Sequence, residues 1–504
     1  MIIPYVLSLL AFLPILGALV ILFGVTRKSQ AKYAALGFAL AELALGLVLT
    51  FDFISTGGFS RSLWDFSYTE SAPWIPTLGA NYILGMDGLS FPMILLNVII
   101  FPVAILFAFS ERERLRQFFA FLLAMEGALN GVFLAQDFFL FYVFWEAVLI
   151  PMFFLIHGWG GPNRRYAAMK FFIYTHVASV VMFVGFLMMY FQYAQLTGVY
   201  TFSMIEIGRM SPLFPAGFQS FAFVLVFFGF AVKMPMVPFH TWLPDAHVQA
   251  PTAGSVILAA MLLKMGGYGL IRVAITMLPA GANQAVPYMA ALGALSMVYG
   301  ALVCLRADDL KRLIAVSSVS HMGFVLLAAS TLSNLGIAAA VFQMFTHGLI
   351  SAMLFMMAGA IGHNVGTRNI SELGGIQAKV PRISAFTKFA FLASLGLPAL
   401  AGFASELPVF LAASGRFGYW VAIPILTVLF TACYYIWAIQ RAFDGPLREE
   451  FKDKEIHDLK PFEMTALASL AALIVLFGIL PFLFWDYVLP YSTTLAGALG
   501  GPIV

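Results

Sequence analysis

The sequence lacks the features on which redox proteins and nucleotide-binding proteins depend. Its 504 residues include only two cysteines, Cys304 and Cys433, which are too few for a disulfide framework or a four-thiolate iron–sulfur cluster. No glycine-rich nucleotide fingerprint follows a strand-like run, and the alternation of apolar and polar residues that is typical of strands is also missing. We therefore expect no cofactor and no metal on this chain, so that any redox step occurs on a partner.

Charged residues are also scarce. They make up 10% of the chain, whereas hydrophobic residues make up 62%. Soluble globular domains contain about 25% charged residues, so this chain cannot cover a soluble particle with polar groups. The composition predicts an integral membrane protein. The formal net charge of +3 is small and forms no basic stripe, which argues against a nucleic-acid partner.

Long apolar runs occupy most of the chain. Because a helix that crosses roughly 30 Å of hydrocarbon needs about 20 apolar residues, these runs predict an all-α protein with about fourteen transmembrane helices in one membrane domain, 1–504. The predicted spans lie near 4–25, 31–54, 85–109, 116–134, 138–158, 167–195, 219–241, 252–278, 285–304, 310–330, 334–361, 383–413, 417–440 and 462–489. Only the connectors 52–84 and 441–461 are long enough to form small surface features.

Basic residues predict the orientation of these spans. Twenty Lys and Arg residues lie in connectors that follow odd-numbered spans, whereas only Arg61, Arg209 and Arg416 follow even-numbered spans. The cytoplasmic connectors of membrane proteins carry the excess of basic residues. Both termini are therefore expected on the outer face, and the regular alternation supports the number of spans.

Two predicted helices contain prolines close to an ionisable residue. The seventh contains Lys233-Met-Pro-Met-Val-Pro238, and the twelfth contains Pro398 followed by Glu406-Leu-Pro408. Proline removes a backbone donor and clashes with the preceding turn, so we expect both helices to be discontinuous at membrane depth. The two helices are five apart, and a five-helix unit used twice must be inverted the second time. Inverted repeats with paired discontinuous helices are typical of a transport path.

This pattern predicts a division of the membrane domain into four parts. The predicted parts are helices 1–3 in 1–109, a first inverted repeat of helices 4–8 in 116–278, a second inverted repeat of helices 9–13 in 285–440, and helix 14 in 462–489.

Ionisable residues recur within the predicted spans, where each one costs roughly 2.5–3.5 kcal/mol at the bilayer centre. Glu126 and Glu146 lie about ten residues on either side of the turn at 136–137, and Lys233 and Lys264 flank the connector 242–251 symmetrically. The members of each pair are therefore expected to share a depth. The full set of candidates is Glu126, Glu146, Lys233, Lys264, His321, His347 and Glu406, with His240 as an additional candidate.

Two interpretations of these residues are open. In the first, they form structural ion pairs, each of which joins one carboxylate to one ammonium group. In the second, they form a proton path along the membrane midplane, because burial and neighbouring charges tune proton affinities and histidine titrates near physiological pH. The series of carboxylates, lysines and histidines in successive helices favours the second. The remaining histidines are expected to be hydrogen-bonded or solvated: His157, His176, His247, His363 and His457.

Long motifs carry a resemblance to a known family. They are Phe141-Tyr-Val-Phe-Trp-Glu-Ala-Val-Leu-Ile-Pro-Met152, Lys233-Met-Pro-Met-Val-Pro-Phe-His240, Lys264-Met-Gly-Gly-Tyr-Gly269, Asp309-Leu-Lys-Arg-Leu-Ile-Ala-Val-Ser-Ser-Val-Ser-His321 and Met86-Asp-Gly-Leu-Ser90. Over nearly its whole length, the sequence resembles the antiporter-like membrane subunits of respiratory complex I (NADH-quinone oxidoreductase). A glutamate at 406, where sister subunits typically have lysine, resembles the M type of subunit.

The resemblance implies a role for each matching candidate. Glu146 resembles the fifth-helix glutamate that modulates the seventh-helix lysine, here Lys233, and this pair is the expected gate of the path. The other positions resemble the central connecting lysine, the two relay histidines and the terminal proton-binding group: Lys264, His321, His347 and Glu406. Glu126 rests on the depth argument and not on the family.

The resemblance also implies partners and a reaction. In the family, electrons pass from NADH or another donor to quinone in other subunits, and this energy drives protons outward. FMN, iron–sulfur clusters and quinone are therefore expected in partner subunits. The expected partners are sister antiporter-like subunits, the peripheral redox arm and lipids. The expected location is a bacterial inner membrane, with both termini on the periplasmic side.

Three alternatives share part of this evidence. A subunit of an Mrp-type cation/proton antiporter or of a membrane-bound hydrogenase has the same core motifs. A stand-alone secondary transporter would use a central pocket for a small solute. A passive membrane scaffold would tolerate neutral replacement of Lys264 and Glu406.

Overall fold

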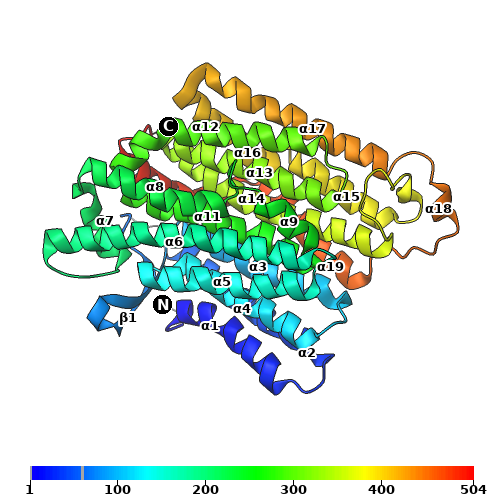
Figure 1. Ribbon diagram of the computed structural model, residues 1–504, viewed down its shortest axis with the longest axis horizontal. Helices are drawn as coiled ribbons and strands as arrows, with labels where there is room; N and C mark the ends of the chain where they lie inside the picture. Colours follow the sequence, from blue (N-terminus) through cyan, green and yellow to red (C-terminus); the bar gives the residue numbers. More distant parts are fainter. Residues whose placement is uncertain (1–2, 58–61, 504) are drawn as a thin grey trace.

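The computed structural model describes residues 3–57 and 62–503, which fold into a bundle of long helices that lie side by side (Figure 1). In the first half of the chain the helices are α1 (Val6–Leu19), α2 (Gln30–Ser55), α3 (Ser90–Phe107), α4 (Leu115–Leu134), α5 (Phe138–Trp159), α6 (Arg164–Thr197), α7 (Met204–Met210), α8 (Ala216–Lys233) and α9 (Trp242–Gln249). The second half contains α10 (Thr252–Ile257), α11 (Leu263–Gly269), α12 (Pro279–Cys304), α13 (Leu310–Ser330), α14 (Asn334–Asn364), α15 (Pro381–Ser394), α16 (Ala401–Phe417), α17 (Ala422–Ala442), α18 (Glu449–Lys452), α19 (Pro461–Ile479) and α20 (Phe482–Leu499).

The helices confirm an integral, multi-pass membrane architecture. Thirteen segments of the described chain are long and apolar enough to cross a bilayer. One of them, Ala401–Ala442, has 42 residues, about twice the length of a single span, and the 3-10 turn Gly418–Val421 interrupts it. This segment therefore contains the second half of the predicted twelfth helix, α16, and the predicted thirteenth, α17.

The expectation that strands are absent was wrong. Residues between α2 and α3 form an antiparallel hairpin of β1 (Ser67–Ile75) and β2 (Ala80–Met86). Its register shifts between Ser67 and Glu70 and again between Pro73 and Ile75, so a regular two-residue alternation is lost. The Glu70 carboxylate accepts hydrogen bonds from the backbone N–H groups of Leu7, at 2.8 Å, and Ser8, at 3.0 Å. The hairpin thereby caps the first turn of α1.

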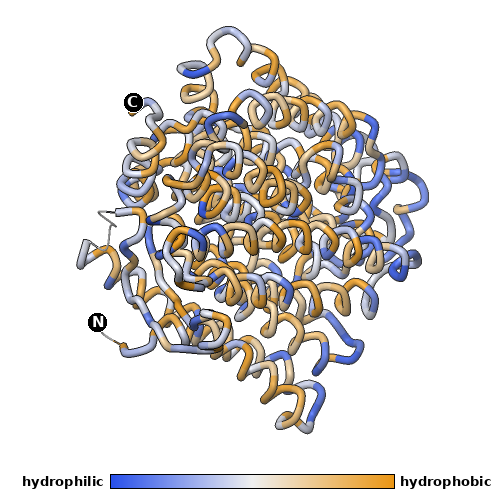
Figure 2. Tube along the Cα trace, turned by 60° about the vertical axis from the view of Figure 1, so that its left-hand side comes forward, coloured by the Kyte–Doolittle hydropathy of each residue, from blue (hydrophilic) through white to orange (hydrophobic). Residues whose placement is uncertain are grey.

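The two ends of the bundle differ in composition. Both chain termini, β1 and α7 lie at one end, and α18 lies at the other (Figure 1). Hydrophilic residues gather most densely at the end opposite the termini, whereas hydrophobic residues follow the helices (Figure 2). The termini therefore share a side, as the even number of spans predicts. Of the basic residues predicted for that side, Arg209 lies on α7 and Arg416 near the end of α16, while Arg61 lies outside the described residues.

Both predicted discontinuous helices are present. The first ends at Lys233, where α8 stops, and the chain is not α-helical at 234–241 before α9 begins. The second stops at the end of α15, and α16 begins after the irregular residues 395–400, which include Pro398. Pro408 does not break the chain, because it lies inside α16. Glu406 consequently lies on a regular helix, near the start of its second turn.

Two local features differ from the predicted spans. The eighth span, Thr252–Ile275, is interrupted by two π-helical segments, Leu258–Leu262 and Leu270–Ile275, which no feature of the sequence indicated. The last span ends at Ile479 instead of 489, since Pro481 disfavours helical geometry at Leu480 and starts the separate helix α20. The division into two inverted repeats stays a prediction.

Candidate functional site

Lys264 lies on α11 between the two π-helical segments. Its fully buried Nζ donates to the carbonyl oxygen of Ala259 at 2.6 Å and lies 2.7 Å from Nδ1 of His347 on α14. In a regular α-helix the Ala259 carbonyl would accept from the N–H of Leu263. Here the Leu263 N–H donates to Leu258, five residues earlier. The π-helical segment therefore provides a carbonyl that holds Lys264 in contact with His347.

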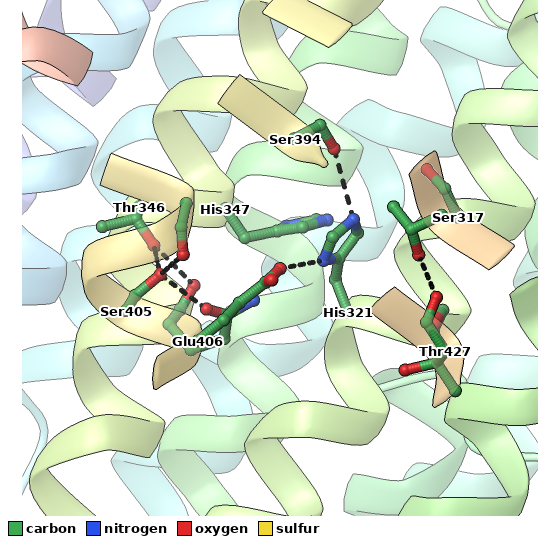
Figure 3. Close-up of polar contacts among 12 residues, drawn as sticks. Ser317, His321, Thr346, His347, Ser394, Ser405, Glu406 and Thr427 are labelled. Carbon is green, nitrogen blue, oxygen red and sulfur yellow. Dashed lines mark hydrogen bonds and ion pairs between the residues drawn. The ribbon is translucent and has the colours of Figure 1, made fainter. Parts of the chain in front are cut away.

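The contacts continue from α14 to α13 and α16 (Figure 3). The ring centroids of His347 and His321 are 5.3 Å apart, with an angle of 48° between the rings. Nδ1 of His321 then lies 3.2 Å from Oε1 of Glu406. The side chains of His321 and Glu406 are only 5% and 8% exposed, so this polar cluster is enclosed by the helices. Four of the residues predicted from the sequence thus form one connected series.

The break between α15 and α16 supplies two groups to this series. Ser394, the last residue of α15, places its Oγ 3.2 Å from Nε2 of His321, while Glu406 contacts the other ring nitrogen. Gly396 lies within the break at a φ of +83°, and a Cβ built there would be 3.1 Å from Oε2 of Glu406. Because an L side chain rarely adopts this φ and would crowd the carboxylate, glycine suits this position.

A branch of hydroxyl groups extends beyond Ser394. Its Oγ lies 2.8 Å from the hydroxyl of Tyr435 on α17, which in turn donates to Oγ of Ser317 at 3.1 Å. A second set lies beside Glu406, where Ser405 donates to Oε1 of Gln343 at 2.7 Å and accepts from Thr346 at 2.7 Å (Figure 3). Sequence reasoning missed these hydroxyl and amide groups, since Ser, Thr and Tyr are also common in helices that carry no protons.

Lys233 has a different environment. It is 1% exposed, and its Nζ has no hydrogen-bond partner within the described residues. The ammonium group instead lies over two aromatic rings, 5.6 Å from the centroid of Trp145 and 5.5 Å from that of Phe171. These distances are typical of cation–π contacts. The predicted ion pair between Lys233 and Glu146 is therefore not formed in this structure.

Glu146 contacts α6 instead of Lys233. Its Oε2 lies 2.8 Å from Nδ1 of His176, and its Oε1 accepts a hydrogen bond from Ser179. The side chains of Glu146 and His176 are 22% and 44% exposed, so this pair lies at the edge of the bundle. His176 and Ser179 are three residues apart and share one face of α6. That spacing is the signal that could have placed both residues beside a carboxylate.

Two additional candidates lie apart from the connected series. His240 is 8% exposed and packs edge-on against Tyr299, with ring centroids 5.0 Å apart, and its Nδ1 has no partner among the described residues. Glu126 is fully buried on α4, and neither of its carboxyl oxygens has a hydrogen-bond partner in the described part of the chain.

His247 is a buried residue whose position the sequence did not indicate. It lies on α9, fully buried, with its ring stacked on Phe355 at a centroid distance of 4.3 Å. Neither ring nitrogen has a partner in the described residues, so the prediction of a hydrogen-bonded or solvated connector histidine was wrong. It interacts electrostatically with both Lys264 and Lys311. His247 therefore lies near Lys264, on the side of that lysine that faces the first discontinuous helix.

A buried ion pair stabilises the helices around this site. Arg272, in the second π-helical segment, lies 2.5 Å from Oδ1 of Asp87, and both side chains are at most 1% exposed. The guanidinium also lies within 5.5 Å of the ring centroids of Phe66, Tyr268 and Tyr491. Such a paired and enclosed cation is structural, since removal of either partner would leave an uncompensated buried charge. No group of three or more His, Cys, Asp or Glu within the described residues could hold a metal ion.

Comparisons with known proteins agree with this architecture. Residues 135–431 match the family model described as NADH:quinone oxidoreductase/Mrp antiporter, TM. Over 98% of both chains, the sequence is 42% identical to F(420)H(2) dehydrogenase subunit M of Methanosarcina mazei. It is also 39% identical to NADH-quinone oxidoreductase subunit M of Rhodobacter capsulatus, over 96% of this chain and 95% of that protein.

Solved structures show the same fold. A chain of respiratory complex I from Thermus thermophilus with bound NADH matches with a TM-score of 0.88 and 29% identity, over 98% of this chain and 100% of that chain. A chain of the Mrp complex from Dietzia matches with a TM-score of 0.82 at 23% identity, over 97% of this chain and 52% of that chain, which shows the shared fold alone. The chain belongs to the NADH:quinone oxidoreductase/Mrp antiporter family, and within it to the antiporter-like membrane subunits of the complex I type that are named subunit M.

Proposed function

We propose that this chain carries protons across the membrane through Lys264, His347, His321 and Glu406. The observation that carries the proposal is their succession through the bundle: Lys264 lies 2.7 Å from His347, the centroids of the two imidazole rings are 5.3 Å apart, and His321 lies 3.2 Å from Glu406. Each group can bind a proton, and each lies on a different helical segment. A structural ion pair would need only one cation and one carboxylate.

The chemistry of the groups suits proton transfer. An imidazole accepts a proton on one nitrogen and releases one from the other, so the two histidines can pass protons between the lysine and the carboxylate. Ser394 on the second nitrogen of His321 orients that ring. The discontinuous backbone at 395–400 supplies carbonyl groups that can bind water at membrane depth.

The first half of the path requires a rearrangement. Lys233 lies over aromatic rings while Glu146 is held by His176, so protons pass between the halves only when Lys233 changes its contacts. Moving one charge against 100 mV costs about 2.3 kcal/mol, so an ungated path would dissipate the gradient. The break at 234–241 gives Lys233 this mobility. His240 and Glu126 are additional proton-binding positions of this half.

The energy for transport comes from partner subunits. The related proteins are named as subunits of F420H2 dehydrogenase and of NADH-quinone oxidoreductase, so the reductant of this complex is one of these two-electron donors. Flavin, iron–sulfur clusters and quinone belong to the partners, which include sister antiporter-like subunits, and lipids surround the bundle. The membrane is a bacterial inner membrane, and both termini face outward, since the basic connectors lie on the opposite side.

Proton translocation by the assembled complex in proteoliposomes tests the proposal. Lys264→Ala and Glu406→Gln are expected to reduce the rate of proton translocation to about a tenth or less, which corresponds to a loss of about 1.4 kcal/mol or more. Lys388→Ala is the matched control, because Lys388 pairs with Asp444 at the surface, outside the series. Normal translocation by correctly assembled Lys264→Ala complex would contradict the proposal and favour a passive scaffold.

A further inference from the structure

A second cluster of buried polar side chains lies among α2, α3 and α4. Its members are Glu42, Asn97, Glu126 and Asn130, and each is 0% exposed. None of them belongs to the series that ends at Glu406. The cluster contains two carboxyl groups, and these interact electrostatically with each other.

The amide groups of the cluster use all of their donors. Asn130 Nδ2 donates to Oε1 of Glu42 and to the carbonyl oxygen of Leu10, both at 2.8 Å. Asn97 Nδ2 donates to Oδ1 of Asn130 at 2.8 Å and to the backbone carbonyl of Glu126 at 3.0 Å. An amide NH2 group has only two hydrogens, so neither asparagine can donate to the remaining oxygens.

Four buried oxygens of the cluster are consequently without a donor in the described residues. They are Oε2 of Glu42, Oε1 and Oε2 of Glu126, and Oδ1 of Asn97. No lysine, arginine or histidine of the described chain forms an ion pair with either carboxyl group. Two ionised carboxylates buried together without a cation would cost far more than the cluster can recover. The missing component is a hydrogen-bond donor or a positive charge.

A proton fits the unpaired oxygens of the cluster better than a divalent metal ion does. Ca²⁺ and Mg²⁺ take about six or more oxygen ligands, whereas the cluster has four free oxygens. One proton supplies the missing donor and leaves a single negative charge on the pair, because two carboxyl groups in one site share a proton. Asn130, which donates to Glu42, stabilises the remaining charge.

The depth of the pair matches that of the central lysine. Glu42 follows the start of α2 at Gln30 by about twelve residues, Glu126 follows the start of α4 at Leu115 by about eleven, and Lys264 follows Thr252 by about twelve, each about 17 Å along its helix. α3 lies between the two clusters. Leu96, next to Asn97, approaches the backbone of Gly348, which follows His347.

We propose that Glu42 and Glu126 form a proton-binding site that holds one shared proton at the depth of Lys264. Infrared spectroscopy of the intact purified complex tests this, because a protonated carboxyl group has a carbonyl band that shifts on exchange into deuterated water. The double variant Glu42→Gln/Glu126→Gln is expected to lose one such band. Each single variant, which keeps the side-chain shape, is expected to shift it, and exposed Glu206→Gln is expected to leave it unchanged.

The outcomes separate this site from the series that ends at Glu406. A spectrum of the double variant that superimposes on that of the wild-type complex would overturn the proposal. A band that disappears when sodium ions are added would also overturn it, since a monovalent cation would then occupy the cluster. The band is expected to persist in Lys264→Ala complex, so its presence does not depend on translocation.

Discussion

The two halves of the bundle hold similar charged groups in opposite arrangements. Around the break between α15 and α16, Lys264, His347, His321 and Glu406 follow one another in series. In the first half, Lys233 lies over aromatic rings at the break after α8, and its expected partner is bound to another helix. The proton-binding groups near Glu406 therefore lie in sequence, whereas those near Lys233 are separated from one another. This difference suits a proton path that is gated at Lys233 alone.

The largest effect is expected at the interrupted half. Lys233→Ala removes the buried ammonium group at the end of α8. Within the described residues, no other cation lies over the rings of Trp145 and Phe171. We expect proton translocation to fall about tenfold or more at normal assembly, a loss of about 1.4 kcal/mol or more. Proteoliposome assays with the Lys388→Ala complex as control measure this. Undiminished translocation would show that the two halves are not joined through Lys233.

A smaller effect is expected within the assembled half. His321→Gln retains hydrogen-bonding groups beside Ser394 and Glu406 but cannot exchange protons between two ring nitrogens. We expect translocation to fall roughly threefold to tenfold, as is typical for the loss of one proton-transfer group that water can partly replace. The pH profile of translocation is the second readout. A profile identical to that of the wild-type complex would mean that His321 positions its neighbours without carrying protons.

His176 offers a way to change the interrupted half. His176→Ala frees Oε2 of Glu146, so the carboxylate can turn toward Lys233, and we expect the pH dependence of translocation to shift while its maximum changes about twofold or less. His176→Gln, which can still donate to Glu146, is the matched control and is expected to leave the pH dependence near that of the wild-type complex. Equal pH profiles for the wild-type, His176→Ala and His176→Gln complexes would show that His176 does not control the position of Glu146.

The smallest effect concerns the connection between α4 and α5, outside the spans. Burial raises the pKa of Asp137 to about 6, although its carboxylate accepts backbone hydrogen bonds from Asn81, Phe139 and Leu140. A folded-state pKa above the unfolded value means that the folded state binds the proton more tightly, so this contribution to stability is lost as pH rises from about 4 to about 6. We expect the thermal midpoint of the wild-type complex, relative to Asp137→Asn complex, to fall across this range. A constant difference would contradict the assignment.

Composition and length predicted most of the fold because the bilayer imposes simple rules. The apolar runs predicted the transmembrane spans. Pro235, Pro238 and Pro398 predicted the helix breaks, since proline removes a hydrogen-bond donor that lipid cannot replace. The hairpin escaped prediction because its register shifts at Ser67–Glu70 and Pro73–Ile75. The π-helical segments beside Lys264 left no signal in the sequence, because they change hydrogen-bond register without changing composition.

The site was predicted less completely than the fold. Buried charge identified Lys264, His347, His321 and Glu406, and the structure joins them. Which groups touch depends on the rotation of each helix, which packing decides. For this reason the sequence suggested a contact between Glu146 and Lys233, whereas the structure places His176 beside Glu146. Glu42 was overlooked because its hydrogen-bond partner, Asn130, is neutral and lies on another helix, α4.

A density map of the assembled complex that resolves water tests the central claim most directly. The account predicts ordered waters beside the imidazoles of His347 and His321 and along the discontinuous backbone at 395–400. It also predicts a dry gap around Lys233 whenever Trp145 and Phe171 lie against its ammonium group. Dry, apolar surroundings of both imidazoles would contradict the proposed path, as would side chains of Lys264 and Glu406 that face the lipid.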